Sequence, residues 1–198
     1  VKMVGAELCP DTEPTTPTTG EAANRYISVD GAIDCSGATF AGAADFKRVQ
    51  FHAATTFNDA HFRDVAMFNE ATFHDQLELW ATVTGKADFS KATITGRAQL
   101  RGTYETALNC DYTDIASDVV LWNITIQGKA EFLAAEFGGA LDCGHVTFEG
   151  VTRFCETHFD AGGDFQHAQF TDTVRFRRIR APNEVITLQG ARLAAGTI

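Results

Sequence analysis

Phenylalanine returns at alternating intervals of five and six residues across the segment FHAATTFNDAHFRDVAMFNEATF, residues 51–73. An amphipathic helix repeats its apolar positions every three or four residues, and a half-buried strand repeats them every second residue. Neither period produces this spacing. The recurrence therefore indicates a coarser repeat, in which each unit of five or six residues is a short extended piece followed by a corner.

The same register extends over most of the chain, from Val29 to Ala181. All sixteen phenylalanines fall on it, and two steps, 79–83 and 100–104, are one residue short. The residues two places before these positions are mostly small or aliphatic. No position in either set is charged, although charged residues make up 21% of the chain. Because residues i and i−2 share one side of an extended strand, both sets are predicted to face inward.

The motifs CSGATF, GAADF, NEATF and GKADF resemble the Ala-(Asp/Asn)-Phe repeat of pentapeptide repeat proteins. The resemblance covers about residues 27–193, and it departs from the commonest family pattern by using Phe for Leu and by alternating five- and six-residue units. It implies an all-β fold, a right-handed quadrilateral β-helix solenoid with one repeat unit on each of four sides. The longer units imply about seven to eight coils, with wider corners on alternate sides.

Three segments are expected along the chain. Residues 26–193 are predicted to form the β-helix, whose last part, after Pro182, is predicted to be a partial coil rather than a capping helix. Residues 1–25 contain CPDTEPTTPTTG and are predicted to be a flexible Pro/Thr-rich tail, and residues 194–198 a short C-terminal tail. No apolar run reaches about 18 residues, so no membrane span is expected.

The net charge restricts the class of binding partner, and the cysteines indicate the cellular compartment. The formal net charge of −10 disfavours direct binding to nucleic acid and suits a basic protein partner. The five cysteines are scattered and contain no Cys-x-x-Cys pair. Cys35 and Cys143 fall on inward positions five coils apart, too far for a disulfide, so both are predicted to be free thiols. Free thiols favour a reducing compartment, and we expect a cytoplasmic location.

Residues one coil apart become surface neighbours in a stacked solenoid. The column that follows the second inward residue of each coil consists of Ser36, Asn58, Trp80, Arg101, Trp122, Gly144 and Gln166. It contains both tryptophans of the chain, and it places Arg101 between them, where its guanidinium can stack on the indoles. One hypothesis is a structural ladder that covers a corner. The other is a partner-binding patch of Trp80, Arg101 and Trp122, with Glu78 and Asp142 from the adjacent column.

The sequence gives little support for catalysis or for metal binding. His52 is predicted to stack on His74, and His145 on His167, but the sequence places no third ligand beside either pair. No metal site and no cofactor are therefore expected. P-loop, HExxH and GxSxG motifs are absent, so the chain is not expected to be an enzyme. An enzyme or metal-binding protein that uses the stacked histidines is the least favoured hypothesis.

The favoured prediction is a non-catalytic, rigid scaffold for protein–protein interaction, of a bacterial type. The family resemblance implies an alternative, mimicry of duplex DNA, in which an acidic rod binds DNA gyrase or another topoisomerase and protects or inhibits it. Residues 1–174 hold 25 acidic and 11 basic residues, which fits mimicry, whereas the segment RFRRIR at 175–180 does not. End-to-end homodimerisation is left open.

Overall fold

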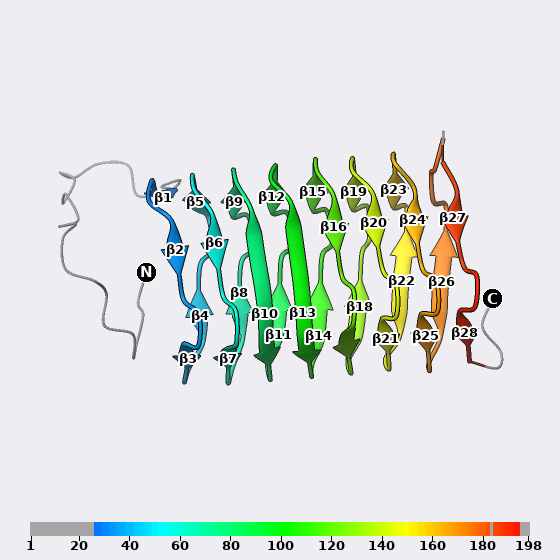
Figure 1. The fold of residues 1–198 in the computed structure, drawn as a ribbon, viewed down its shortest axis with the longest axis horizontal. Coiled ribbons are helices and arrows are strands. Elements are labelled where there is room, and N and C mark those ends of the chain that lie inside the picture. Colours follow the sequence, from blue (N-terminus) through cyan, green and yellow to red (C-terminus); the bar gives the residue numbers. More distant parts are fainter. Residues whose placement is uncertain (1–25, 183, 195–198) are drawn as a thin grey trace.

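The computed structural model describes residues 26–182 and 184–194, which form short parallel strands stacked along one axis as a β-solenoid of about eight turns (Figure 1). In Figure 1 the near strands run downward and the far strands upward while the chain advances from left to right, so the coil is right-handed. The described residues contain no helix. The all-β solenoid predicted from the repeat is confirmed. Apart from Ala194, the two predicted terminal tails lie outside the described residues.

Four sides can be followed along the rod, and each successive coil adds one strand to a side. The first side is a seven-stranded sheet of β1 (Ile27–Val29), β5 (Val49–Phe51), β9 (Thr72–Phe73), β12 (Thr93–Ile94), β15 (Asp114–Ile115), β19 (Glu136–Phe137) and β23 (His158–Phe159). The fourth side is a second seven-stranded sheet of β4 (Ala44–Asp45), β8 (Ala66–Met67), β11 (Lys86–Asp88), β14 (Ala107–Asn109), β18 (Lys129–Glu131), β22 (Thr152–Cys155) and β26 (Val174–Arg177).

The second and third sides belong to one sheet of 14 strands. The second side consists of β2 (Ile33–Asp34), β6 (Thr55–Thr56), the first half of β10 (Leu77–Val83), the first half of β13 (Ala98–Tyr104), β16 (Val119–Val120), β20 (Leu141–Asp142), β24 (Gly163–Asp164) and β27 (Ile186–Thr187). The third consists of β3 (Thr39–Phe40), β7 (Ala60–Phe62), the second halves of β10 and β13, β17 (Ile124–Ile126), β21 (Thr147–Phe148), β25 (Gln169–Phe170) and β28 (Arg192–Leu193).

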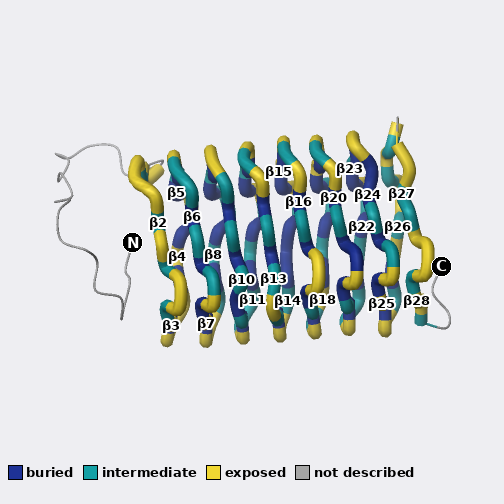
Figure 2. Tube along the Cα trace, in the orientation of Figure 1, coloured by how far each residue is buried: buried dark blue, intermediate teal, exposed yellow. Residues whose placement is uncertain are grey.

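The predicted inward residues fill the interior of the rod. Phe51 pairs with Phe73 in the strand register, and their rings stack with centroids 4.7 Å apart and planes 9° apart. From Ala44 to Val174 the inward positions are buried, with the single exception of Gly102, and the exposed stretches lie mainly at the corners (Figure 2). Small residues such as Ala60 sit two places before the rings and leave room for them.

The two unit lengths correspond to two kinds of corner. Each five-residue step has a residue with positive φ two places after the inward residue; at Asp59 φ is 57°, and the N–H of Ala60 donates to the carbonyl of Phe57 at 3.2 Å. This is the geometry of a tight type II-like turn. The six-residue steps have no positive φ at that place. In the step 62–68 the carboxylate of Asp64 instead accepts from the N–H of Val65 at 2.8 Å, and in the step 159–165 Gly162, three places after Phe159, has a φ of 84°. Two corner geometries therefore alternate around the coil.

The two short steps abolish a corner. In β10 and β13 the chain runs straight through seven residues, with no tight turn between the second side and the third. In these two coils one continuous strand forms both the second and the third side, and its two halves pair with strands of different sides. Gly102 in β13 has a φ of 97°, and a Cβ atom there would lie 2.2 Å from the carbonyl oxygen of Ala81, so only glycine fits this close approach.

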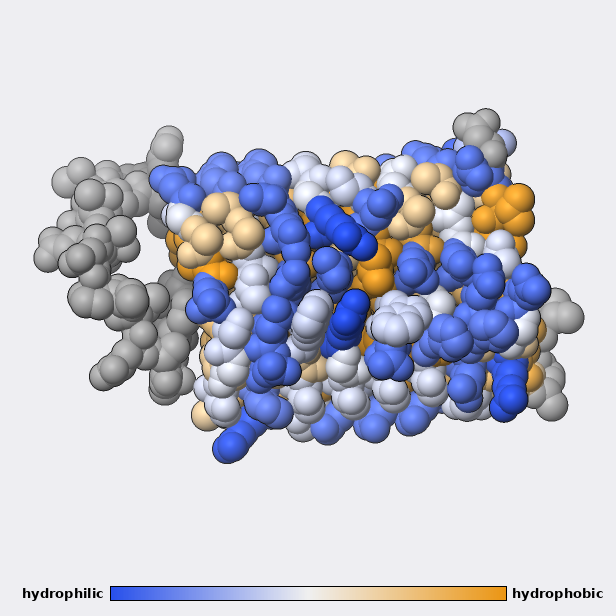
Figure 3. Space-filling model, in the orientation of Figure 1, coloured by the Kyte–Doolittle hydropathy of each residue, from blue (hydrophilic) through white to orange (hydrophobic). Residues whose placement is uncertain are grey.

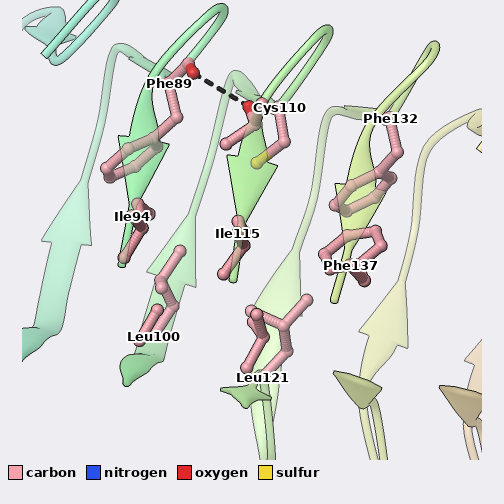
Figure 4. A pocket seen from close by; sticks show the side chains of 11 residues that line it. Phe89, Ile94, Leu100, Cys110, Ile115, Leu121, Phe132 and Phe137 are labelled. Atoms are coloured by element: carbon pink, nitrogen blue, oxygen red, sulfur yellow. Dashed lines mark hydrogen bonds between the residues drawn. The ribbon is translucent and has the colours of Figure 1, made fainter. Parts of the chain in front are cut away.

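The ladder of phenylalanine rings on the fourth side is interrupted in the middle of the rod. On the fourth side Phe89 stacks on Phe68, and Phe132 on Phe154, but Cys110 occupies the position between these two stacks. A cavity of about 20 Å³ lies beside Cys110 (Figure 4), lined only by apolar surface. The nearby hydroxyl of Thr113 donates to the carbonyl of Phe89 at 2.9 Å, the dashed line in Figure 4.

The described cysteines are free, as predicted. Cys143 is fully buried and Cys35 is half-buried, and burial raises the pKa of both thiols. Cys110 and Cys155 are also free thiols. After Pro182 the coil continues through β27 and β28, which pair with β24 and β25, so the predicted partial eighth coil is confirmed over its described residues.

Candidate functional site

The straight strands β10 and β13 present a ladder of outward side chains. Trp80 in β10 pairs in register with Arg101 in β13, and Trp122 follows β16 one coil further on. The guanidinium carbon of Arg101 lies 4.5 Å from the ring centroid of Trp80 and 5.7 Å from that of Trp122. The sandwich expected from the column is present. We call Trp80, Arg101 and Trp122 the indole–arginine patch.

The patch is accessible at its Trp122 end. Trp122 is 44% exposed, whereas Trp80 and Arg101 are half-buried. Figure 3 views the face on which β10 and β13 lie, and it shows hydrophobic surface among hydrophilic side chains near the middle of the rod. β10 and β13 run straight from the second side to the third on this face (Figure 1), whereas the other coils have a separate strand on each of these sides.

The patch contains polar atoms that lack partners. Within the described part of the chain, no carboxylate lies at ion-pair distance from Arg101. Nε of Arg101 and Nε1 of Trp80 are buried donors without a hydrogen-bond acceptor, and Oδ1 of Asn58, one coil before Trp80, is a buried acceptor without a donor. These three are the unsatisfied buried side-chain atoms among the described residues, and all belong to one column. Such groups call for an explanation, because burying an unpaired polar atom is unfavourable.

Glu78 and Asp142, the two acidic residues predicted to take part in partner binding, have different hydrogen-bond donors. Glu78 lies two residues before Trp80 in β10, where the side-chain amide of Asn58 donates to its carboxylate at 2.8 Å and that of Gln76 donates to its other oxygen. Asp142 in β20 accepts the backbone N–H of Gly144 at 2.8 Å. Neither carboxylate forms an ion pair with Arg101 in the described structure. The partner-binding role of all five residues stays a prediction.

Sequence reasoning missed three supports of the patch. The ring of His145 meets Trp122 edge to face, with centroids 6.3 Å apart. A Cβ atom on Gly144 would lie 3.3 Å from Cδ1 of Trp122, so the absence of a side chain there leaves room for the indole. The third support is the hydrogen bond that the side-chain amide of Gln76 donates to the carboxylate of Glu78. Gly144 was visible in the column, but the contacts of His145 and Gln76 depend on side-chain directions that the spacing does not specify.

The predicted histidine stacks are present on the surface. The rings of His52 and His74 lie 4.5 Å apart with planes 5° apart, and those of His145 and His167 lie 5.1 Å apart. Over the residues that the structure describes, no group of three or more His, Cys, Asp or Glu side chains is arranged to hold a metal ion. In the same residues, no helix has the length and apolar character needed to cross a membrane.

Two outward carboxylates on the fourth side, Asp88 and Glu131, are paired with cations. Asp88 pairs with Lys86 at 2.9 Å, and Glu131 with Arg153 at 2.6 Å. Burial raises the pKa of Asp88, but hydrogen bonds from Lys86 and Ser90 outweigh it and leave that pKa below its ordinary value.

Asp111, one residue after the buried Cys110, shows the opposite shift. Burial raises the pKa of its carboxyl, the backbone N–H of Leu133 partly opposes the rise at 2.7 Å, and Glu131 adds to it.

Comparison with known protein families matches residues 36–83 to the family model for pentapeptide repeats, nine copies. The chain contains pentapeptide repeats. The comparisons with curated proteins and with solved structures found no match. The matched segment ends at the close of β10, and the parallel coil continues beyond it to β28, with strands in matching register from coil to coil. This fold is consistent with a non-catalytic repeat scaffold.

Proposed function

We propose that this pentapeptide-repeat rod is a scaffold that binds a protein partner through the indole–arginine patch, with Glu78 and Asp142 at its rim. The observation that carries the proposal is the stack of Arg101 between Trp80 and Trp122 on the outer face. Tryptophan and arginine are the residue types most enriched among the side chains that dominate binding energy at protein interfaces.

The rod suits such a role because its surface is already ordered. Strand pairing between coils sets the position of each outward side chain, so a partner that binds the patch orders few further groups. An indole presents a large contact area and has only two rotatable side-chain bonds. Stacking in the ladder restricts Trp80 further, and the edge of His145 restricts Trp122.

Affinity capture with matched variants tests this proposal. The wild-type protein, the double variant Trp80→Ala with Trp122→Ala, and the control Tyr112→Ala are immobilised, and captured proteins are compared by quantitative mass spectrometry. Tyr112 is a 55% exposed aromatic residue at a different corner of the rod. We expect a specific partner to be captured by wild type and by the control but lost from the double variant, with unchanged circular dichroism. A partner that the double variant retains would contradict the proposal.

The acidic composition favours one competing function, mimicry of duplex DNA toward a topoisomerase. The chain has 26 acidic and 16 basic residues, although Asp88 and Glu131 are paired with cations. A supercoiling assay with DNA gyrase and purified protein decides this alternative. Inhibition of the enzyme, or its protection from an inhibitor, at micromolar protein would support mimicry, and an unchanged reaction would dismiss it for this enzyme.

A further inference from the structure

We propose that Arg101 is the receptor for a carboxylate of the protein partner, presented by an acidic side chain that has basic neighbours. This inference rests on the proposed function, because it specifies the chemistry that the indole–arginine patch recognises. Three observations support it: the guanidinium of Arg101 has no ion-pair partner among the described residues, unsatisfied N–H donors lie at the patch, and acidic side chains lie before and after Arg101 along the rod.

The guanidinium of Arg101 is held in place without being neutralised. Two indoles hold its faces, at 4.5 Å and 5.7 Å from their centroids, and no carboxylate of the described residues pairs with it. Lys86 and Arg153 are neutralised, by Asp88 and Glu131 respectively. Within the described part of the chain Arg63 also lacks an ion pair, but it is exposed and has no ring contact, whereas Arg101 is held between two indoles. A stacked guanidinium keeps its N–H groups in the plane between the rings, and these donors match a carboxylate in a two-point hydrogen bond.

Stacking also lowers the conformational entropy that the Arg101 side chain loses when it binds a carboxylate. A free arginine side chain must be ordered before it can form a two-point contact, whereas Arg101 is already confined by Trp80 and Trp122. The unsatisfied Nε of Arg101 and Nε1 of Trp80 add two donors beneath the surface of the patch. Neither donor has a hydrogen-bond acceptor among the described residues.

The acidic residues near Arg101 determine which residues should flank the partner's carboxylate. Glu78 lies one coil before Arg101 and Asp142 two coils after it, about 5 Å and 10 Å along the axis by the spacing of paired strands. These acids repel a polyanion, and so does the net charge of −10. They attract lysine or arginine. The complementary surface is a single acidic side chain between two basic ones, which argues for a protein segment and against nucleic acid.

NMR titration of the wild-type protein tests the assignment with defined probes. The chain has two tryptophans, so two indole N–H signals report on the two sides of Arg101, and Trp122→Phe assigns them. The probes are sodium acetate, acetyl-Lys-Glu-Lys-amide, acetyl-Glu-Lys-Glu-amide and inorganic phosphate. We expect saturable shifts of both signals with the Lys-Glu-Lys peptide at a Kd of about 1 mM, and about tenfold weaker binding of the Glu-Lys-Glu peptide and of phosphate.

Two variants separate the site from a general charge effect. Arg101→Gln should remove the saturable shifts, whereas Arg63→Gln, which deletes an exposed arginine outside the patch, should leave them unchanged. Shifts that persist in Arg101→Gln, no saturable shift in wild type, or stronger binding of phosphate than of the Lys-Glu-Lys peptide would each overturn the assignment.

The capture experiment and the titration fail independently. If a captured partner depends on Trp80 and Trp122 but binds Arg101→Gln as well as wild type, the proposed function stands and the carboxylate receptor is refuted. If the peptide binds at Arg101 while every captured protein is retained by the double tryptophan variant, the receptor stands and the scaffold proposal fails.

Discussion

Replacing Phe62 with alanine tests whether the inward ladder of rings stabilises the rod. Phe62 is 1% exposed at the end of β7, and its ring stacks on Phe40 with centroids 4.5 Å apart and planes 4° apart. Its centroid also lies 5.7 Å from that of Phe57. Truncation removes these contacts and leaves a cavity between coils joined by backbone hydrogen bonds, which limit collapse. We therefore expect a loss of about 3–5 kcal/mol in the free energy of unfolding.

The matched control is the neighbouring residue on the same strand. His61 is exposed and points away from the interior, so His61→Ala should change the free energy of unfolding by no more than about 0.5 kcal/mol. Urea denaturation followed by circular dichroism and by tryptophan fluorescence measures both variants. Similar losses for Phe62→Ala and His61→Ala, or a loss below about 1 kcal/mol for Phe62→Ala, would refute the inward register and the packing argument built on it.

Three further predictions concern the middle of the rod. Cys110→Val should raise the free energy of unfolding by about 1 kcal/mol, because the added methyl groups enter the existing cavity. Cys143 is buried but does not line the cavity, so Cys143→Val should lower the free energy of unfolding by about 1–3 kcal/mol through overpacking. Urea denaturation measures both variants, and equal changes in their free energies of unfolding would contradict this prediction. Asp111→Asn should be stabilising at neutral pH, because the pKa of Asp111 is raised in the folded state and its ionisation there opposes folding. The gain should disappear as pH falls below the pKa of the unfolded chain, and a gain that grows toward acid pH in thermal melts would show the sign to be wrong. Gly128→Ala should prevent soluble expression or lower the melting temperature strongly, since its Cβ would lie 1.6 Å from a backbone oxygen of the neighbouring coil; a melting temperature equal to wild type would disprove that close approach.

The amino-acid sequence by itself determined the coil and the direction of its side chains. Whether Phe51 faces inward depends on strand alternation within its own unit, and the stack of Phe51 on Phe73 follows once each coil has the same number of units. The columns follow from the same count, so the order Trp80, Arg101, Trp122 was available from spacing alone. Local alternation and a constant repeat need no knowledge of side-chain conformation.

Only the tertiary structure decided what happens where the repeat is broken. A unit one residue short can compress its corner or lose it, and β10 shows that the corner is lost because the remaining residues continue the strand pairing on both sides. The cavity at Cys110 and the hydrogen bonds that hold Glu78 also depend on atoms one coil away. Those outcomes are set by packing between coils, which the spacing of residues along the chain does not specify.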